Sequence, residues 1–307
     1  MLCCWFCYKD SGKEEYHSKC SNLFFGTDEV PLLQLDNNLL EKLADKTINK
    51  HIAVTGVQPK LSVTLDKSKN QNRLTITGLW GEYILKPQHA AYPYMPETES
   101  LTMHLAAEFK IHVCEHTLLK ATDGRLVYIA KRFDRNKGNK IHVEDLCQLS
   151  EFLTENKYKG SYEKTGKLIS AYCAHTGLDT LNYFELVLFS YLSGNNDMHL
   201  KNFSLVHGEN GIALSSAYDL LNVNLINPKD DEELALTLNG KKKKIKISDF
   251  TALASTLKIP GKATQNIYKK FSSANAAVKR LIDASFLGKK EKKKYWEIWM
   301  KKQEIFS

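Results

Sequence analysis

The stretch from residue 183 to residue 205 constrains this chain more than any other. Its apolar side chains recur at helical spacing, which predicts a helix over residues 180–193 that is buried on most sides. Gly194 then ends the pattern, because glycine tolerates the left-handed backbone found after a helix. Polar residues follow, and an apolar run begins again at Phe203. The sequence therefore predicts a polar loop between a buried helix and a strand.

This loop carries a carboxylate and a carboxamide at a spacing used in phosphoryl transfer. Asp197 and Asn202 are separated by four residues, with His199 and Lys201 between them. In protein kinases, an Asp in such a loop accepts the proton of the substrate hydroxyl and the Asn holds a Mg2+ ion. The spacing alone is common, so its meaning depends on the rest of the chain.

The part of the chain before this loop predicts a β-rich half over residues 51–132, with five strands and one helix. A strand follows Gly56, and a hairpin over 74–87 turns between Gly78 and Gly81. Lys86 lies near the end of that hairpin. The helix begins at Pro96, where Glu99 is placed either to pair with Lys86 or to act as a plain carboxylate in the first turn.

The other predicted elements of this half are strands at 113–119 and 126–133, and a helix within residues 27–50. One face of that helix carries five leucines: Leu32, Leu35, Leu39, Leu40 and Leu43.

The part after residue 133 is predicted to be mainly helical. Helices are expected at 143–155, at 161–175 and over the last 60 residues, where the stripe Trp296, Ile298 and Trp299 is predicted to belong to the core. Asn210-Gly211 and Asn239-Gly240 predict two hairpins, the second with a type I′ turn. Lys241–Lys244 is either a solvated strand or a nucleic-acid patch. We expect an α+β protein of two lobes, 27–132 and 133–307, preceded by a Cys/His extension over 1–26.

Four metal-ligating side chains lie in that extension. Cys4 and Cys7 are separated by two residues, and so are His17 and Cys20. Two such pairs suit a tetrahedral Zn2+ ion, and with all four positions filled the site would be structural. The alternative is that the cysteines are small core residues and His17 lies on the surface.

Composition indicates the cellular compartment of the protein and the charge of its binding partners. The formal net charge of +8 favours acidic partners, or only a basic surface. The seven cysteines are odd in number, and three of them (Cys114, Cys147 and Cys173) are scattered through ordinary elements, which indicates a reducing compartment. We find no secretory signal and no run near the ~20 apolar residues of a membrane span, so we expect a cytoplasmic protein.

These motifs together resemble the HipA-like serine/threonine kinase toxins of bacterial toxin–antitoxin systems. The resemblance covers about residues 51–260, and the motifs follow the order of that family. They are Thr55–Lys60, Ile84–Pro87, Glu99, Lys131–Arg135, Glu144–Gln148, Leu192–Phe203 and Ala217–Leu220. Because we find no room before residue 51 for the extra N-terminal subdomain of HipA, the chain looks most like the short HipT branch.

The resemblance implies a role for each matching residue, beginning with a kinase-like, two-lobed fold. Asp197 would be the catalytic base, Asn202 and Asp219 would hold Mg2+, and Lys86 would contact the phosphates. The remaining ATP contacts would be Thr55, Gly56, Val57, Gln58, Pro59, Lys60, Lys131, Phe133, Asp134, His199, Leu200, Lys201 and Tyr218. Tyr218-Asp219 stands where ordinary kinases have D-F-G.

The resemblance also implies regulation and partners. Serines in or before the 55–60 loop are autophosphorylated in the family, but this chain has Ala53 and Thr55 there, so Thr55 is the candidate site or the control is lost. The expected substrate is an aminoacyl-tRNA synthetase, specific for tryptophan or glutamate. A HipB-like antitoxin that binds DNA and a separate HipS-like protein would be the partners. The alternatives are a kinase-like module without catalysis, and a small-molecule or lipid kinase.

Overall fold

The computed structural model describes residues 2–33, 60–67, 72–77, 80–89, 91–136 and 138–307. It divides into two compact units, each with its own core. Unit 1 comprises residues 1–100, 114–132 and 284–286, and unit 2 comprises 101–113, 133–283 and 287–307. Within the chain's central part, the boundary falls between Arg132 and Phe133.

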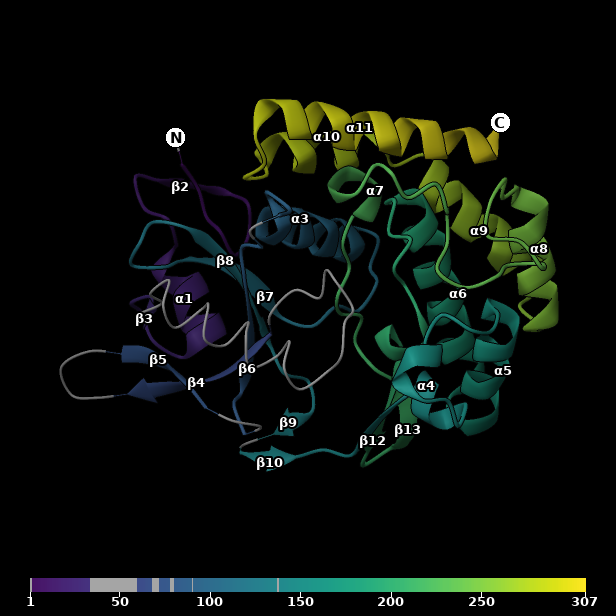
Figure 1. The fold of residues 1–307 in the computed structure, drawn as a ribbon, viewed down its shortest axis with the longest axis horizontal. Helices are drawn as coiled ribbons and strands as arrows, with labels where there is room; N and C mark the ends of the chain where they lie inside the picture. Colours follow the sequence, from purple (N-terminus) through teal and green to yellow (C-terminus); the bar gives the residue numbers. More distant parts are fainter. Residues whose placement is uncertain (1, 34–59, 68–71, 78–79, 90, 137) are drawn as a thin grey trace. The chain divides into compact units, whose positions relative to one another are not determined.

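A six-stranded sheet forms the framework of unit 1 in the described part of the chain (Figure 1). Its order is β3-β5-β4-β6-β8-β7, antiparallel except where β3 runs parallel to β5. The strands are β3 (Leu32–Leu33), β4 (Leu61–Lys67), β5 (Asn72–Ile76), β6 (Tyr83–Pro87), β7 (His116–Lys120) and β8 (Leu126–Lys131). Leu61, Val63, Leu74 and Leu85 are buried, as alternation along these strands predicts.

The strand pairing corrects the hairpin predicted over residues 74–87. β5 and β6 both pair with β4, on its two sides, and do not pair with each other. Gly81 allows the chain to approach the side of β4 on which β6 pairs. The Gly81 N–H donates to Ser62 Oγ at 3.0 Å, and a Cβ at position 81 would lie only 2.7 Å from Val63 N. Only glycine fits so close to the neighbouring strand.

The N-terminal segment belongs to unit 1 and packs against its sheet. It consists of the two-stranded β1 (Leu2–Cys3) and β2 (Asp10–Gly12), then α1 (Ser18–Phe25). Phe24 and Phe25 of α1 lie against Tyr83 of β6, with ring centroids 5.6 and 6.1 Å away. Tyr16 contributes a hydrogen bond to Thr117 Oγ1 at 2.8 Å. Leu32, predicted on a helix, lies in strand β3, and the rest of that predicted helix lies outside the described residues.

The helix α3 (Met95–Glu108) begins in unit 1 and ends in unit 2. Unit 2 is then mainly helical (Figure 1). Its longer helices are α5 (Tyr162–Tyr172), α6 (Thr176–Leu192), α8 (Ile247–Thr256), α9 (Gly261–Ser272), α10 (Asn275–Ala284) and α11 (Lys289–Gln303). α6 is buried along most of its length and packs on α5, α8 and α11, as its apolar run predicts. Trp299 of α11 is fully buried, whereas Trp296 and Ile298 are half-buried, so the predicted core stripe is confirmed at Trp299.

Short elements complete unit 2. They are β9 (Arg135–Asn136), β10 (Asn139–Lys140), β11 (Val143–Asp145), α4 (Leu146–Leu149), η1 (Thr154–Asn156), η2 (Leu200–Asn202), β12 (Ser204–Gly208), β13 (Gly211–Leu214), α7 (Val223–Ile226) and η3 (Glu304–Phe306). β11, β12 and β13 form one antiparallel sheet, and the hairpin predicted at Asn210-Gly211 joins its last two strands, with Glu209 and Asn210 in the turn and Gly211 opening β13.

The predicted helix over 143–155 is wrong. Residues 143–145 form β11, and α4 covers four residues only. The reason is a capping box: Asp145 accepts from Gln148 N, and Gln148 Oε1 accepts from Asp145 N, both at 2.9 Å. This arrangement starts a helix at Leu146 and leaves the residues before it extended.

The second predicted hairpin is correct only at its turn. Asn239 and Gly240 have φ values of 48° and 75°, as a type I′ turn requires, and Leu238 forms an isolated bridge with Lys241. The flanking residues are not strands. Three lysines of the run that follows are ion-paired, Lys241 with Asp249, Lys242 with Glu232 and Lys243 with Asp231.

Candidate functional site

The loop after α6 is rigidly held inside unit 2. Gly194 takes the left-handed backbone at φ 71°, as predicted, and the chain then leaves the helix. Met198 and Leu200 are buried, and Tyr162 donates a hydrogen bond to Met198 O at 3.1 Å. Leu200 N donates to Lys157 O at 3.2 Å. The polar residues between these anchors are therefore held in one conformation.

Asp197 and Asn202 lie together in this loop. The Asn202 side chain is buried, and its Nδ2 donates to the backbone oxygen of Asp197 at 3.0 Å. The short helix η2 brings them together, because Asn202 N also donates to His199 O at 2.9 Å. With its nitrogen engaged, the carboxamide offers its oxygen, which is the atom that a hard cation takes.

A tyrosine that sequence reasoning missed touches the candidate base. Tyr158 donates its hydroxyl to Asp197 Oδ1 at 2.5 Å, and its ring meets the His199 ring edge-on at 4.9 Å. Burial, followed by the charge of Asp197, raises the pKa of Tyr158 well above its usual value, so the phenol stays a donor. It precedes Asp197 by 39 positions, and no spacing in the sequence connects the two.

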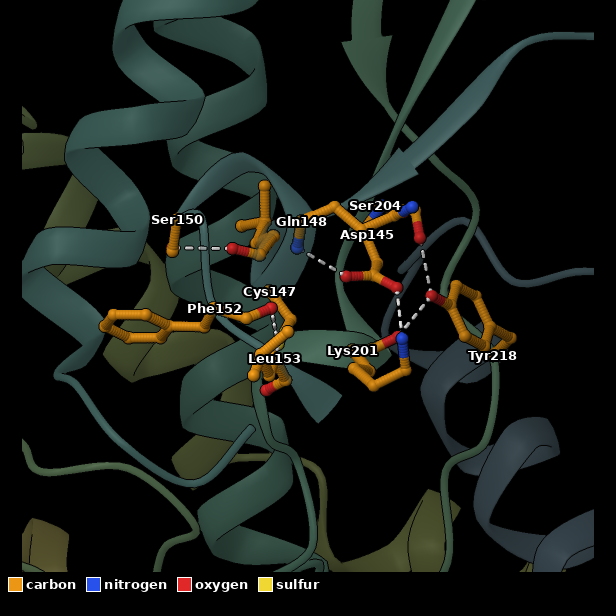
Figure 2. A network of polar contacts seen from close by, with 10 residues as sticks. Asp145, Cys147, Gln148, Ser150, Phe152, Leu153, Lys201, Ser204 and Tyr218 are labelled. Carbon is orange, nitrogen blue, oxygen red and sulfur yellow. Dashed lines mark hydrogen bonds and ion pairs between the residues drawn. The ribbon is translucent and has the colours of Figure 1, made fainter. Parts of the chain in front are cut away.

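A second network fixes the other end of the loop (Figure 2). Lys201 Nζ pairs with Asp145 Oδ2 at 2.6 Å, and Asp145 also caps α4. Tyr218 donates its hydroxyl to Lys201 O at 2.8 Å and accepts from Ser204 Oγ at 2.6 Å. These bonds tie the segment at 218 to the segment at 201.

Asp219 follows directly in the chain and has φ 60°, a strained backbone for a residue with a side chain. Because Tyr218 is bonded to the neighbour of Asn202, the two expected metal ligands belong to segments that are joined. A carboxylate and a carboxamide oxygen are the hard ligands that Mg2+ prefers. The donor set of unit 2 therefore fits the ion that the sequence predicts.

Unit 1 contains a buried ion pair. Lys86 Nζ lies 2.5 Å from Glu99 Oε1, and the two side chains are 5% and 2% exposed. Lys86 is directly opposite Tyr128 on β8, and its ammonium lies 5.5 Å from the centre of that ring. This confirms the pairing that sequence left as one of two options. An ammonium held in this way is a fixed point charge for phosphate oxygens.

Glu97 is a second buried carboxyl in the first turn of α3. Its Oε2 has no hydrogen-bond partner among the residues described. Burial raises the pKa of Glu97 to about 7. Unlike Glu99, it has no ion-paired lysine within the described part of the chain to offset the loss of water.

The remaining expected ATP contacts are distributed over both units. Thr55, Gly56, Val57, Gln58 and Pro59 lie outside the described residues, and Lys60 is exposed just before β4. The N–H of Lys131 is donated to Glu115 O at 2.8 Å, so it is already used within unit 1. Phe133, Asp134, His199 and Leu200 belong to unit 2, where Asp134 pairs with Arg135 at 2.7 Å.

The Cys/His residues of the N-terminal segment do converge. The ligand atoms of Cys4, Cys7, His17 and Cys20 all lie within 4.8 Å of one another. His17 Nδ1 is 3.5 Å from Cys7 Sγ and 3.6 Å from Cys20 Sγ. Burial and then the charge of Cys4 raise the pKa of Cys20 to about 12, since thiolates this close repel unless a cation joins them. Three thiols and one imidazole are a donor set that fits Zn2+.

A search of the described helices finds none that is both long and apolar enough to cross a membrane.

The comparison with known families agrees with this geometry. A family model described as the HipA-like C-terminal domain matches residues 52–278, which is more than half of the chain. The chain belongs to the HipA-like family. Its fold is the mixed α+β, kinase-like fold of that family, with a β-rich N-terminal unit and a helical C-terminal unit.

Two relatives show how far the likeness extends. A Haemophilus influenzae protein named "Putative kinase" is 29% identical over 185 residues, 56% of this chain and 53% of that protein. The serine/threonine-protein kinase toxin HipA of Shewanella oneidensis is 24% identical over 211 residues, 62% of this chain and 47% of that protein. This chain thus spans about half the length of the curated relatives it matches.

Solved structures share the fold. The HipA chain from the Shewanella oneidensis complex of HipA, HipB and operator DNA superposes with a TM-score of 0.68 at 22% identity, over 82% of this chain and 64% of that chain. The Helicobacter pylori proinflammatory kinase CtkA superposes with a TM-score of 0.51 at 14% identity, over 80% of this chain and 92% of that chain.

Proposed function

We propose that this protein is an ATP- and Mg2+-dependent serine/threonine-protein kinase that acts as the toxin of a toxin–antitoxin system. The observation that carries the proposal is the loop in which Asn202 is hydrogen-bonded to Asp197 and Tyr158 donates to the same aspartate. Membership of the HipA-like family and the buried pair Lys86–Glu99 support it.

Each residue has a defined task in this proposal. Asp197 accepts the proton of a serine or threonine hydroxyl as that oxygen attacks the γ-phosphorus, the bond from that phosphorus to the β,γ-bridging oxygen breaks, and ADP leaves. Tyr158 holds the Asp197 carboxylate in place. Lys86, kept in position by Glu99, offers a positive charge to the phosphates. Asn202 and Asp219 would hold Mg2+, which neutralises the charge on the transferred phosphoryl group.

The finer parts of the proposal concern substrate and control. We propose that the substrate is an aminoacyl-tRNA synthetase, specific for tryptophan or glutamate, and that Thr55 is the autophosphorylated residue. A HipB-like antitoxin is the proposed partner, since the Shewanella HipA occurs in a complex with HipB and operator DNA. A HipS-like protein, as in the short HipT branch, is the further proposed partner, and the cytoplasm is the proposed location.

The test compares induction of the wild-type chain and of Asp197→Gln in a bacterial host, with phosphoproteomics of both. We expect growth arrest and one new phosphosite on a synthetase with the wild type, and neither with Asp197→Gln. Equal arrest by Asp197→Gln without a new phosphosite would favour the kinase-like binding module. Turnover of ATP on a lipid or small molecule, with no protein phosphorylated, would favour the second alternative.

We also propose that the N-terminal cluster holds a structural Zn2+ ion. Metal analysis of the protein purified without added zinc should find one zinc per chain, and Cys7→Ser should lose it. Cys3→Ser is the matched control, because Cys3 is the neighbouring cysteine outside the cluster. Zinc-free wild-type protein, or full zinc content in Cys7→Ser, would remove this assignment.

A further inference from the structure

Three side chains of unit 2 converge on one face of the strands β11 and β12, away from the residues assigned above. His142 precedes β11, Glu144 lies within it, and His207 lies in β12. Val143 is opposite Val206, and His207 N donates to His142 O at 3.0 Å. The two histidines are therefore a cross-strand pair, and Glu144, two positions along, points to the same face.

The distances between their polar atoms match the edges of a metal coordination sphere. Glu144 Oε2 lies 3.3 Å from His142 Nε2 and 3.2 Å from His207 Nε2. The three ligand atoms all lie within 4.8 Å of one another. Ligands bound to Zn2+ at about 2.0–2.2 Å in tetrahedral geometry are separated by roughly 3.3–3.6 Å. Two of the three edges already have nearly this length.

We propose that His142, Glu144 and His207 form a second metal site, which takes a borderline divalent cation of the Zn2+ class. Two imidazole nitrogens and one carboxylate oxygen suit Zn2+ and disfavour Mg2+, which prefers oxygen ligands alone. Water fills the remaining position. This site is independent of the proposed kinase activity.

The alternative is that both imidazoles merely share hydrogen bonds with Glu144. That reading accounts for the two nitrogen–oxygen distances. The centroids of the two histidine rings lie 4.4 Å apart, and each ring presents its Nε2 atom to Glu144 Oε2. Hydrogen bonding uses the Nε2–H of each ring as a donor, whereas metal binding uses the Nε2 lone pair of each ring, and the titration below distinguishes these two arrangements.

The position of the site predicts what binding does. The His142 side chain is 63% exposed, so an ion can enter from solvent. Alternation along β11 places Asp145, which holds Lys201, on the face opposite to Glu144. An ion here joins β11 to β12, the strand that follows the Asn202 loop. Binding should therefore stabilise the folded protein against heat.

The test is a calorimetric titration of the full-length protein with Zn2+, after one equivalent has filled the cysteine cluster. We expect one further equivalent to bind and to raise the unfolding temperature. His142→Ala and His207→Ala should each weaken this step at least about tenfold, and Glu144→Gln, which keeps the side-chain shape, should weaken it as well. His175→Ala, an exposed histidine of the same unit, is the matched control and should bind like the wild type.

Two further measurements distinguish metal binding at the cysteine cluster from metal binding at the histidine–glutamate site. Co2+ bound by cysteine shows a thiolate charge-transfer band, so the second equivalent of Co2+ should bind without increasing that band. Mg2+ should not compete. The proposal is overturned if the wild type takes up no metal beyond the cysteine cluster, or if the histidine and glutamate variants bind the second equivalent as tightly as the wild type.

Discussion

Breaking the Lys86–Glu99 pair from either side should destabilise the protein strongly. The atoms lie 2.5 Å apart, and the two side chains are 5% and 2% exposed, so neither charge can recover its hydration when its partner is removed. Lys86→Met leaves a buried carboxylate, and Glu99→Leu leaves a buried ammonium above the Tyr128 ring. Each single variant thus retains a buried charge without the partner that it has in the wild type.

The expected cost follows from that retained charge. Removing one partner of a buried pair lowers the free energy of unfolding by about 3–5 kcal/mol. Replacing both partners with apolar side chains of similar volume is often close to neutral. The variant Lys86→Met/Glu99→Leu should therefore be more stable than either single variant, which gives a coupling energy of several kcal/mol in a double-mutant cycle.

Urea unfolding of the four proteins measures this coupling. The pair Lys131–Glu115 is the matched control on the same sheet, since its atoms lie 3.1 Å apart but its side chains are 43% and 50% exposed. Lys131→Met should cost less than about 1 kcal/mol. The reasoning is refuted if Lys86→Met lowers the free energy of unfolding no more than Lys131→Met does. It is also refuted if the loss in the double variant equals the sum of the losses in Lys86→Met and Glu99→Leu. Phosphoryl transfer should be lost in all three variants of the buried pair, including the stable double variant.

Three further predictions follow from single side chains. Tyr158→Phe removes the hydrogen bond to Asp197. Steady-state kinetics should then show kcat lowered about tenfold and the KM for ATP unchanged. An unaltered kcat would exclude a positioning role for Tyr158. Burial raises the pKa of Glu97 from 4.5 to about 7, so the folded state keeps a proton that the unfolded state releases. The free energy of unfolding should therefore fall by about 3 kcal/mol as the pH rises between these two values. Urea unfolding at several pH values should show this fall in the wild type and not in Glu97→Gln. Gly194→Ala places a Cβ 2.7 Å from Asn222 Oδ1, at a residue whose φ is 71°. The clash and the left-handed backbone together should lower the free energy of unfolding by about 3 kcal/mol. A urea midpoint near that of the wild type would contradict this close approach.

Local features of the sequence were sufficient for several parts of the fold. The apolar run before Gly194 predicts α6, because a helix buried on most sides needs large side chains all around it. Asn239-Gly240 predicts a type I′ turn because both residues tolerate positive φ. The paired spacings of Cys4, Cys7, His17 and Cys20 predict a cluster, since two residues between ligands let both reach one point.

Pairings between distant residues could not be predicted in this way. The pattern of a strand indicates which of its faces is buried but not which strand it pairs with, and so the hairpin predicted over 74–87 is wrong. β4 takes both β5 and β6 as neighbours because Gly81 lets the chain approach Ser62. At 143–145, pairing with β12 and the cap at Asp145 outweigh an apolar spacing that suggests a helix.

The buried helix, the type I′ turn and the cysteine–histidine cluster follow from spacing within about one helical turn or one strand, and the family resemblance follows from the order of motifs along residues 51–260. The contact of Tyr158 with Asp197, and of His142 with His207 across two strands, is visible in the tertiary structure alone. The physical reason is that side chains far apart in sequence meet only once packing and strand register are established, and no local pattern encodes that register.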